Sequence, residues 1–365
     1  MSLGKNYLMI YIRWILFLCI YFPSRSLATS KCQDAAGANA GDWAILYKAP
    51  AQERGKILLP GANWVNNAAP VANVGHSFAK ALEHVVASDR NNKFIAYNNA
   101  PPDISKVKTK SNSKGVLMMD TSNADAASWI VHTVPGFPKA LRGYLFPPAE
   151  VQKGHLLICL TITEGQIDTI ALTLRIATPL IYHSDIPDAE MDSRPNLKKL
   201  VNGESRILPP LTVTREISTE GPRGLKITIY SKGEKSKYEI YRRILIKKLK
   251  STIKVWTARD KKLKSDCRIP GKNIRLVTSP ISVSGDQSTL EDDVSQWLVT
   301  EVGNKFCVVD KPYQKSQTKE SSMAFVLFSD QYFQKQYLSL FCILLYYNEV
   351  ISNVTVITQQ EQHKK

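Results

Sequence analysis

The residue types that most often carry catalysis are scattered along this chain. Its six histidines form no His-Glu-x-x-His sequence and no pair four residues apart. The cysteines contain no Cys-x-x-Cys spacing, which argues against a structural zinc site. The sequence therefore supports neither a metal nor another cofactor. The histidines are His76, His84, His132, His155, His183 and His363.

Charge is the second chemical feature. The 365 residues include 48 Lys and Arg against 32 Asp and Glu, a formal charge of +16, and 44% are hydrophobic. Residues 220–275 alone hold 18 Lys and Arg against 5 Asp and Glu. This segment indicates either a solvated helix face or a patch that follows a phosphate backbone. DNA or another polyanion is the expected partner, contacted through Lys247, Lys248, Lys261 and Lys262.

The first 28 residues have the pattern of a secretory signal peptide. Lys5 precedes the apolar run 14–22, and small residues at Ser26 and Ala28 place the cut after Ala28. A membrane anchor is the alternative, but the run is about half of the ~20 residues that a span needs. We therefore expect a secreted protein without a transmembrane segment. Asn353 begins the only Asn-x-Ser/Thr sequence and is a candidate glycosylation site.

The elements that position chemistry alternate between strand and helix patterns. Strands are predicted at 42–48, 94–97, 115–120, 128–138, 225–230 and 253–256, and helices at 76–86 and 238–249. The runs at 115–120 and 128–138 are expected to be adjacent buried strands. In the second helix, Tyr238, Tyr241, Ile244, Leu245 and Leu249 share one face.

This alternation indicates an α/β (α+β) fold. A Pro- and Asp-rich stretch at 185–195 is the best candidate for a boundary. The expected organisation is a signal peptide at 1–28, an N-terminal lobe at 29–184, a C-terminal lobe at 185–350 and a tail at 351–365.

Three segments resemble a known family: 41–50, 97–102, and 113–138 with its Lys-Gly-Val-Leu-x-x-Asp and Trp-x-Val-His-x-Val-Pro-x-Phe-Pro patterns. They resemble deoxyribonuclease II, an acid endonuclease family, and 288–297 is a weaker match. The resemblance implies two pseudo-symmetric phospholipase D-like lobes, each a mixed sheet with flanking helices, that present one His-x-Lys motif apiece to a shared cleft. In such a metal-free site one histidine attacks phosphorus and the other protonates the leaving oxygen.

The chain departs from this pattern at the decisive positions. Asn112 stands at the first histidine position, and only Lys114 of that motif is kept. In the second motif Val294 replaces the histidine and Gln296 the lysine. Loss of a covalent nucleophile costs on the order of 10⁶ in rate in a comparable catalytic unit. His132, the one histidine inside a matching segment, is either a structural residue or a helper that lines the cleft.

The resemblance also implies disulfides. Cys32 and Cys159 match the first bridge of the family, and Cys267 is expected to pair with Cys342. Cys307 lacks its expected partner near 321–325 and is predicted to be a free thiol.

The leading expectation is a secreted, catalytically impaired deoxyribonuclease II-like protein that binds nucleic acid through a basic surface. The alternatives are an active, metal-independent acid endonuclease and a secreted interaction protein on the same scaffold.

Overall fold

The computed structural model describes residues 29–104, 107–122, 125–204, 209–222, 224–258, 262–302 and 305–328. Several predicted features lie outside these residues: the signal peptide, the tail, Lys261, Cys342 and Asn353. Within the described ranges, no helix is both long enough and apolar enough to cross a membrane.

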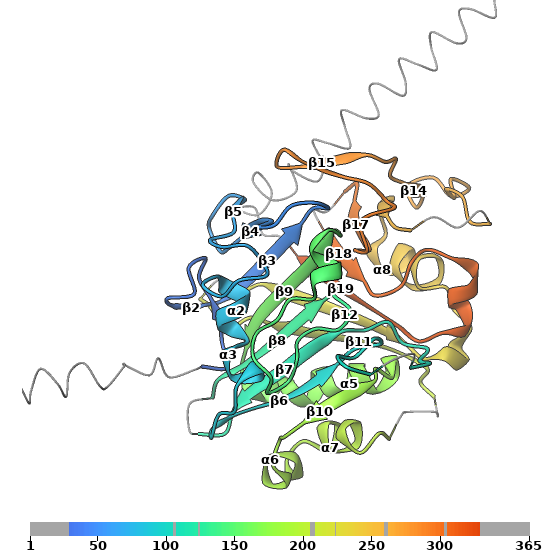
Figure 1. Ribbon diagram of the computed structural model, residues 1–365. Coiled ribbons are helices and arrows are strands. Elements are labelled where there is room, and N and C mark those ends of the chain that lie inside the picture. The colour runs from blue at the N-terminus through green and yellow to red at the C-terminus, as the bar shows by residue number, and fades with distance from the viewer. Residues whose placement is uncertain are drawn as a thin grey trace, which may run out of the picture.

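Two large β-sheets form the centre of the molecule (Figure 1). The first has the strand order β10-β6-β7-β8-β9-β3-β4-β5, and its neighbouring strands run antiparallel. Its strands are β3 (Trp43–Lys48), β4 (Lys56–Leu58), β5 (Val65–Asn66), β6 (Asn92–Tyr97), β7 (Gly115–Asp120), β8 (Ala127–His132), β9 (His155–Ile162) and β10 (Ile181–Ser184).

The second sheet has the order β11-β12-β19-β18-β17-β13-β14, and among these described strands only β13 and β14 pair in parallel. Its strands are β11 (Thr212–Ser218), β12 (Lys226–Lys232), β13 (Ile253–Trp256), β14 (Ile274–Leu276), β17 (Trp297–Thr300), β18 (Lys305–Val309) and β19 (Ser322–Phe328). Two small hairpins pair β1 (Cys32–Gln33) with β2 (Ala40–Gly41) and β15 (Ile281–Val283) with β16 (Asp286–Ser288).

The helices are short apart from α5. They are α2 (Ser77–Ala81), α3 (Glu83–Val86), α4 (Pro148–Val151), α5 (Ile167–Ala177), α6 (Asp188–Asp192), α7 (Pro195–Val201) and α8 (Ile246–Leu249). Shorter turns are η1 (Glu164–Gln166), η2 (Glu234–Ser236), the π-helical η3 (Tyr241–Leu245) and η4 (Lys315–Lys319).

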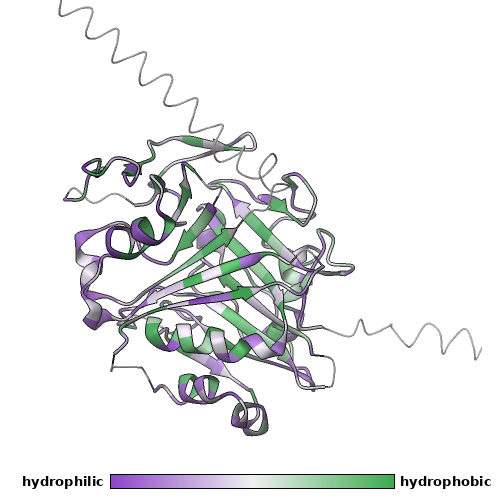
Figure 2. Cartoon of the chain, turned by 180° about the vertical axis from the view of Figure 1, so that it is seen from behind, coloured by the Kyte–Doolittle hydropathy of each residue, from purple (hydrophilic) through white to green (hydrophobic). Residues whose placement is uncertain are grey.

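One hydrophobic core lies between the inner faces of the two sheets. Alternate residues of β8 and β19 enter it, and the rings of Trp129 and Phe325 meet edge to face with centroids 5.0 Å apart. The outer face of the first sheet packs against α2 and α3, and that of the second against η3 and α8. Figure 2 shows the hydrophobic residues concentrated on the strands. The two sheets therefore share one core, and the candidate site lies at the ends of their central strands.

The predicted α/β (α+β) class is confirmed, and each strand predicted from the sequence corresponds to a strand of one sheet. The strands β7 and β8 pair antiparallel as neighbours, as predicted. One prediction is wrong: Tyr238 does not share the buried helix face, because it precedes the helix and 45% of its surface is exposed. A left-handed Lys237 separates η2 from the following helix (φ 53°). The two-lobe pseudo-symmetry and the boundary at 185 stay predictions.

The predicted Cys32–Cys159 disulfide is confirmed, and it joins β1 to β9 with the two Cα atoms 5.7 Å apart. Within the described residues Cys267 is exposed and Cys307 is buried, and neither forms a disulfide. The predicted partner of Cys267 lies outside these residues. Burial raises the pKa of the Cys307 thiol, which makes it an unreactive core residue.

Candidate functional site

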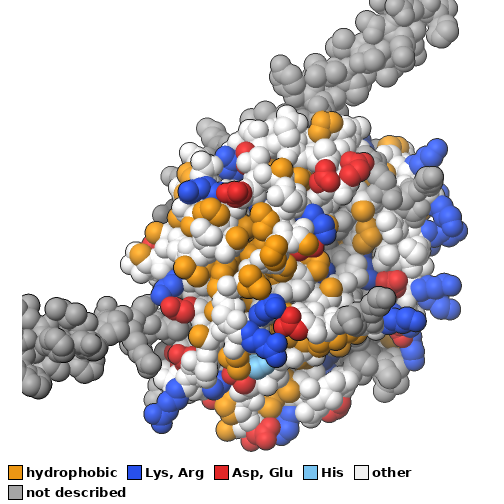
Figure 3. Space-filling view, in the orientation of Figure 1, with side chains coloured by type: hydrophobic (Ala, Val, Ile, Leu, Met, Phe, Trp, Pro, Cys, Tyr) orange, Lys and Arg blue, Asp and Glu red, His pale blue; other side chains and the backbone are white. Residues whose placement is uncertain are grey.

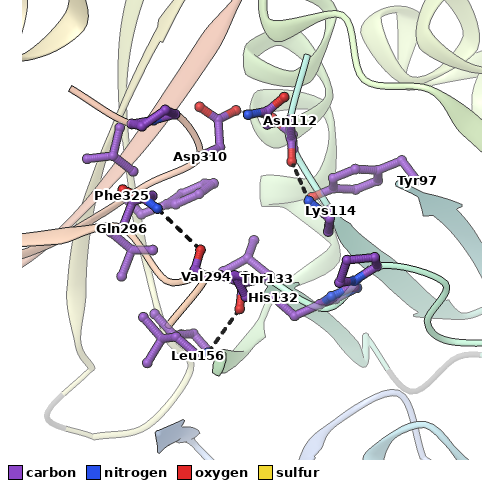
Figure 4. A pocket seen from close by; sticks show the side chains of 17 residues that line it. Tyr97, Asn112, Lys114, His132, Thr133, Leu156, Val294, Gln296, Asp310 and Phe325 are labelled. Atoms are coloured by element: carbon purple, nitrogen blue, oxygen red, sulfur yellow. Dashed lines mark hydrogen bonds between the residues drawn. The ribbon is translucent and has the colours of Figure 1, made fainter. Parts of the chain in front are cut away.

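A pocket of about 210 Å³ lies where the two sheets meet, and it collects both motif segments (Figure 4). The first segment immediately precedes β7 and the second immediately precedes β17. Residues almost 200 positions apart in the sequence therefore line the same pocket. The polar side chains of the wall come from Tyr97, Asn112, Ser113, Lys114, His132, Thr133, Gln296 and Asp310, and the apolar ones include Val131, Pro135, Leu156, Val294, Val308 and Phe325.

The first segment is fixed by contacts that cross between the sheets. The Nζ of Lys311, which follows β18, donates to Oδ1 of Asn112 over 3.0 Å. Ser113 donates a short hydrogen bond to the Asp310 carboxylate. Lys114 is half-buried and its Nζ donates to the Asn112 carbonyl over 3.3 Å. Asn112 and Lys114 thus sit side by side on one wall of the pocket.

Strand β7 can begin directly after Lys114 because its first residue, Gly115, has no Cβ atom. A Cβ atom at this position would lie 2.4 Å from the Ile130 carbonyl oxygen and 2.5 Å from the Tyr97 hydroxyl. Only glycine permits this close approach of β7 to β8 and to the Tyr97 ring.

The second segment is anchored by Asp293. Its Oδ2 accepts hydrogen bonds from the Tyr47 hydroxyl at 2.6 Å and from Nε1 of Trp256 at 2.9 Å. The backbone N–H of Val294 donates to the Gly154 carbonyl over 3.1 Å. These contacts join the first sheet to the second and set Val294 and Gln296 into the pocket.

His132 ends β8 and lines the same pocket. Its Nδ1 accepts the Val134 N–H over 3.2 Å, and the ring meets Phe137 edge to face. Burial, together with the charges of Lys114 and His155, lowers the pKa of His132 well below its ordinary value. His132 is therefore a neutral ring whose accepting nitrogen is already occupied.

Behind His132, a buried polar chain supports the pocket wall. The Thr133 hydroxyl lies 3.1 Å from Nδ1 of His155 and accepts the Leu156 N–H over 3.0 Å. The Nε2 of His155 lies 3.0 Å from Oε2 of Glu150. This chain fixes Thr133 at the edge of the pocket.

Three charged residues beside the pocket were not singled out by the sequence analysis: Lys232, Asp310 and Lys311. Lys311 and Lys232 are fully buried, and Glu320 forms an ion pair with Lys311. Burial raises the pKa of the Asp310 carboxyl, against the effect of its hydrogen bond from Ser113. The available signal was the pair Asp310-Lys311 directly after the apolar run of β18.

Burial lowers the pKa of two lysines at the pocket. Desolvation lowers the pKa of Lys114 to about 8, opposed by the nearby Asp310 carboxylate and reinforced by Lys311. Desolvation likewise lowers the pKa of Lys232 to about 8. Near neutral pH and below, Lys114 thus supplies an ammonium group at the wall.

Comparison with known proteins decides the family. The family model for Deoxyribonuclease II matches residues 31–342. The chain belongs to the deoxyribonuclease II family. It is 26% identical to Plancitoxin-1 of Acanthaster planci, over 71% of this chain and 76% of that protein. It is 23% identical to Deoxyribonuclease-2 of Caenorhabditis elegans (70% and 77% covered) and to Deoxyribonuclease-2-beta of Rattus norvegicus (72% and 76%).

Membership of the deoxyribonuclease II family supports a nuclease-like function in general. The structure brings together all five residues predicted for its site: Asn112, Lys114, His132, Val294 and Gln296. Asn112 and Val294, which stand at the positions predicted for the motif histidines, carry no imidazole. Within the described ranges no three His, Cys, Asp or Glu side chains come together as a metal site would require. The arrangement can hold an anion through N–H groups and the Lys114 ammonium.

Three of the basic residues predicted to contact DNA lie within the described residues, and none of the three lines the pocket. Lys247 and Lys248 are exposed on α8, and Lys262 is exposed in the segment before β14. Figure 3 shows Lys and Arg side chains along the right-hand edge of the molecule, beside η4 and this segment. Part of the charge is neutralised, because Asp266 binds both Arg242 at 2.6 Å and Arg268 at 2.8 Å.

Proposed function

We propose that this protein is a secreted member of the deoxyribonuclease II family that binds nucleic acid and does not cleave it through a phosphohistidine. The observation that carries this proposal is the composition of the pocket. Asn112 and Val294, at the two predicted histidine positions, both line it, and neither side chain can attack phosphorus or carry a proton. Lys114 remains to attract a phosphate.

His132 does not replace the missing nucleophile. A neutral imidazole has one lone pair for attack, and in His132 the lone pair of Nδ1 accepts the Val134 N–H. The other nitrogen then carries the proton. Protonation to imidazolium is opposed by burial and by Lys114, so His132 is also a poor proton carrier at mildly acid pH.

Secretion and polyanion binding are parts of the same proposal. The N-terminal signal pattern and the Cys32–Cys159 disulfide support an oxidising compartment. The exposed Lys247, Lys248 and Lys262 support electrostatic contact with a phosphate backbone.

Plasmid nicking at pH 5 in chelator tests the proposal. We expect no cleavage above background from the unmodified protein. The triple variant Asn112→His, Val294→His, Gln296→Lys restores both motifs and is expected to gain metal-independent nicking. The matched control restores only Asn112→His and should stay inert, since one imidazole supplies nucleophile or acid but not both. Robust nicking by the unmodified protein would show instead an active endonuclease with a rearranged site.

A further inference from the structure

A hydroxyl, an imidazole and a carboxylate follow one another in and behind the wall of the pocket. The Oγ1 of Thr133 lies 3.1 Å from Nδ1 of His155, and Nε2 of His155 lies 3.0 Å from Oε2 of Glu150. A nucleophile, a base and an acid that orients the base define one type of catalytic unit. From this geometry we infer that Thr133 is the nucleophile of a further activity, the hydrolysis of small carboxylic esters. The inference goes beyond the proposed function and does not depend on it.

The carboxylate sets the position of the proton on the imidazole. Although burial opposes it, the contacts from His155 and Lys153 lower the pKa of Glu150, which is therefore ionised. A carboxylate only accepts, so the ring proton of His155 is on Nε2. The lone pair of Nδ1 then faces Thr133, whose hydroxyl donates to it. The base is thus ready to take the proton of the hydroxyl.

The fold holds the three side chains in this order. His155 begins β9 and is fully buried, and Glu150 lies on α4 and is 6% exposed. Lys153 donates to Oε1 of Glu150 over 2.7 Å, which leaves Oε2 for His155. The Leu156 N–H donates to the Thr133 oxygen over 3.0 Å, and one lone pair of that oxygen remains for attack. Thr133 is half-buried and lines the pocket, so the nucleophile is the member of the unit that meets a substrate.

The surroundings of Thr133 suit an uncharged acyl group. Leu156 and Val294 line the pocket together with Thr133 (Figure 4). An apolar cavity of about 150 Å³ holds benzene, so a pocket of about 210 Å³ accommodates a short acyl chain. The Nε2–H of His132, which lines the same pocket, has no hydrogen-bond partner among the described residues. In the inferred reaction it donates to the carbonyl oxygen as negative charge develops there.

The reaction consumes one ester and one water. The Thr133 oxygen attacks the carbonyl carbon, and its proton passes to Nδ1 of His155. The bond from that carbon to the alcohol oxygen breaks, and the alcohol leaves with the proton from His155. Water then attacks the acyl-threonine and gives one proton to His155. As the carboxylic acid leaves, this proton returns to the Thr133 oxygen.

His155 is available as a base at neutral pH. Burial lowers its pKa below the ordinary value and Lys48 acts in the same direction, while Glu150 and Asp293 oppose the shift. The neutral ring therefore predominates at pH 7 and above. The catalysed rate should be constant in this range, whereas attack by free hydroxide rises in proportion to the hydroxide concentration.

Release of p-nitrophenol from p-nitrophenyl butyrate at pH 7 tests the inference. Peptide mass analysis after acid quenching should find the butyryl group of the intermediate on Thr133. The variant Thr133→Val keeps the shape without the hydroxyl and should lower the rate by about a hundredfold or more, whereas Thr133→Ser should retain activity. The matched control Thr214→Val makes the same change at an exposed position of β11 and should react as the unmodified protein does.

Glu150 is a positioning residue, and it has its own readout. In Glu150→Gln a neutral amide no longer fixes the proton on Nε2, so kcat should fall by about tenfold or more while KM stays unchanged. Thermal melting establishes that each variant is folded, and the butyryl site of the unmodified protein decides where one is not.

Three outcomes would overturn the inference: no hydrolysis by the unmodified protein, a butyryl group on another residue, or equal rates with Thr133→Val. None of them bears on the proposed function, because DNA retention and DNA cleavage are measured without the ester.

Discussion

Two positions at the residue scale set the chemistry of the pocket. A His-x-Lys pair needs an imidazole with a free lone pair facing phosphorus. The proposal places at those positions the amide of Asn112 and the isopropyl group of Val294, which both line the pocket. The side-chain amide of Asn112 has a fixed orientation, because its oxygen accepts a hydrogen bond from Lys311. On the proposed function, these two residues leave a site that binds nucleic acid and does not cleave it through a phosphohistidine.

Lys114 predicts how binding depends on pH. Burial lowers the pKa of its amine to about 8, so the side chain is charged below that pH and neutral above it. Affinity for a short DNA strand, whose diesters keep a constant charge, should fall as the pH rises from 7 to 9. In Lys114→Met this part of the pH dependence should disappear. Fluorescence anisotropy across this range is the measurement, and an unchanged profile in Lys114→Met would exclude a role for this amine.

His84 predicts a loss of stability in acid. The side chain is 2% exposed, neither ring nitrogen has a hydrogen-bond partner among the described residues, and burial lowers the pKa of His84 to about 4. The unfolded chain, with a pKa near 6.5, binds the proton more readily. Above pH 6.5 the free energy of unfolding is therefore not reduced by protonation of His84. As the pH falls from 6.5 toward 4, the free energy of unfolding decreases by on the order of 3 kcal/mol because the unfolded chain binds the proton more tightly.

Urea unfolding of His84→Leu at several pH values measures this effect. The free energy of unfolding of the variant should fall less steeply between pH 6.5 and 4 than that of the unmodified protein. Parallel curves for the two proteins would assign the acid sensitivity to other groups.

At the scale of elements, the sequence patterns located strands such as β3, β7 and β8 well because these strands are buried on both faces and therefore appear as continuous apolar runs. The residues 42–48 became β3, and 115–120 became β7. The helix at 238–249 was placed less accurately, since Tyr238 continues the helical spacing while its backbone lies outside the helix. Asp310 and Lys311 were missed because their role comes from contact with Asn112 and Ser113 across the two sheets, which no local pattern encodes.

The proposed basic surface is tested through the two exposed lysines of helix α8. The double variant Lys247→Glu, Lys248→Glu should bind duplex DNA more weakly and reduce the slope of log K against log salt, by ~0.9 for each phosphate that the protein no longer neutralises. Folding should be unchanged, because both side chains are exposed. The matched control reverses Lys198 and Lys199, an exposed pair on α7. Equal effects from both pairs would indicate general charge rather than a surface centred on α8.

The whole molecule is organised around one core shared by two sheets, and the pocket depends on their relative position. Asp293 and Gly154 join the sheets at the site, and Trp129 meets Phe325 deeper in the core. Whether the chain is built from two pseudo-symmetric lobes stays a prediction. The shared core indicates cooperative unfolding, in which loss of either sheet opens the pocket.

The disulfide is expected to contribute at this scale. Cys32 and Cys159 are 127 residues apart, so the loop-entropy model gives about 4 to 5 kcal/mol of stabilisation. The variant Cys32→Ala, Cys159→Ala should lower the free energy of unfolding by roughly this amount or less. Urea titration under non-reducing conditions provides the value. No change relative to the unmodified protein would contradict a stabilising role for the bridge.

The central claim, binding without phosphohistidine cleavage, is tested most directly by one measurement with two readouts. A labelled DNA duplex is incubated with the unmodified protein at pH 5 in chelator, and the bound fraction and the fragment lengths are determined on the same sample. We predict that the duplex is retained by the protein at low salt and stays intact. Fragments that accumulate in proportion to the protein concentration, or no retention at any salt concentration, would contradict the claim.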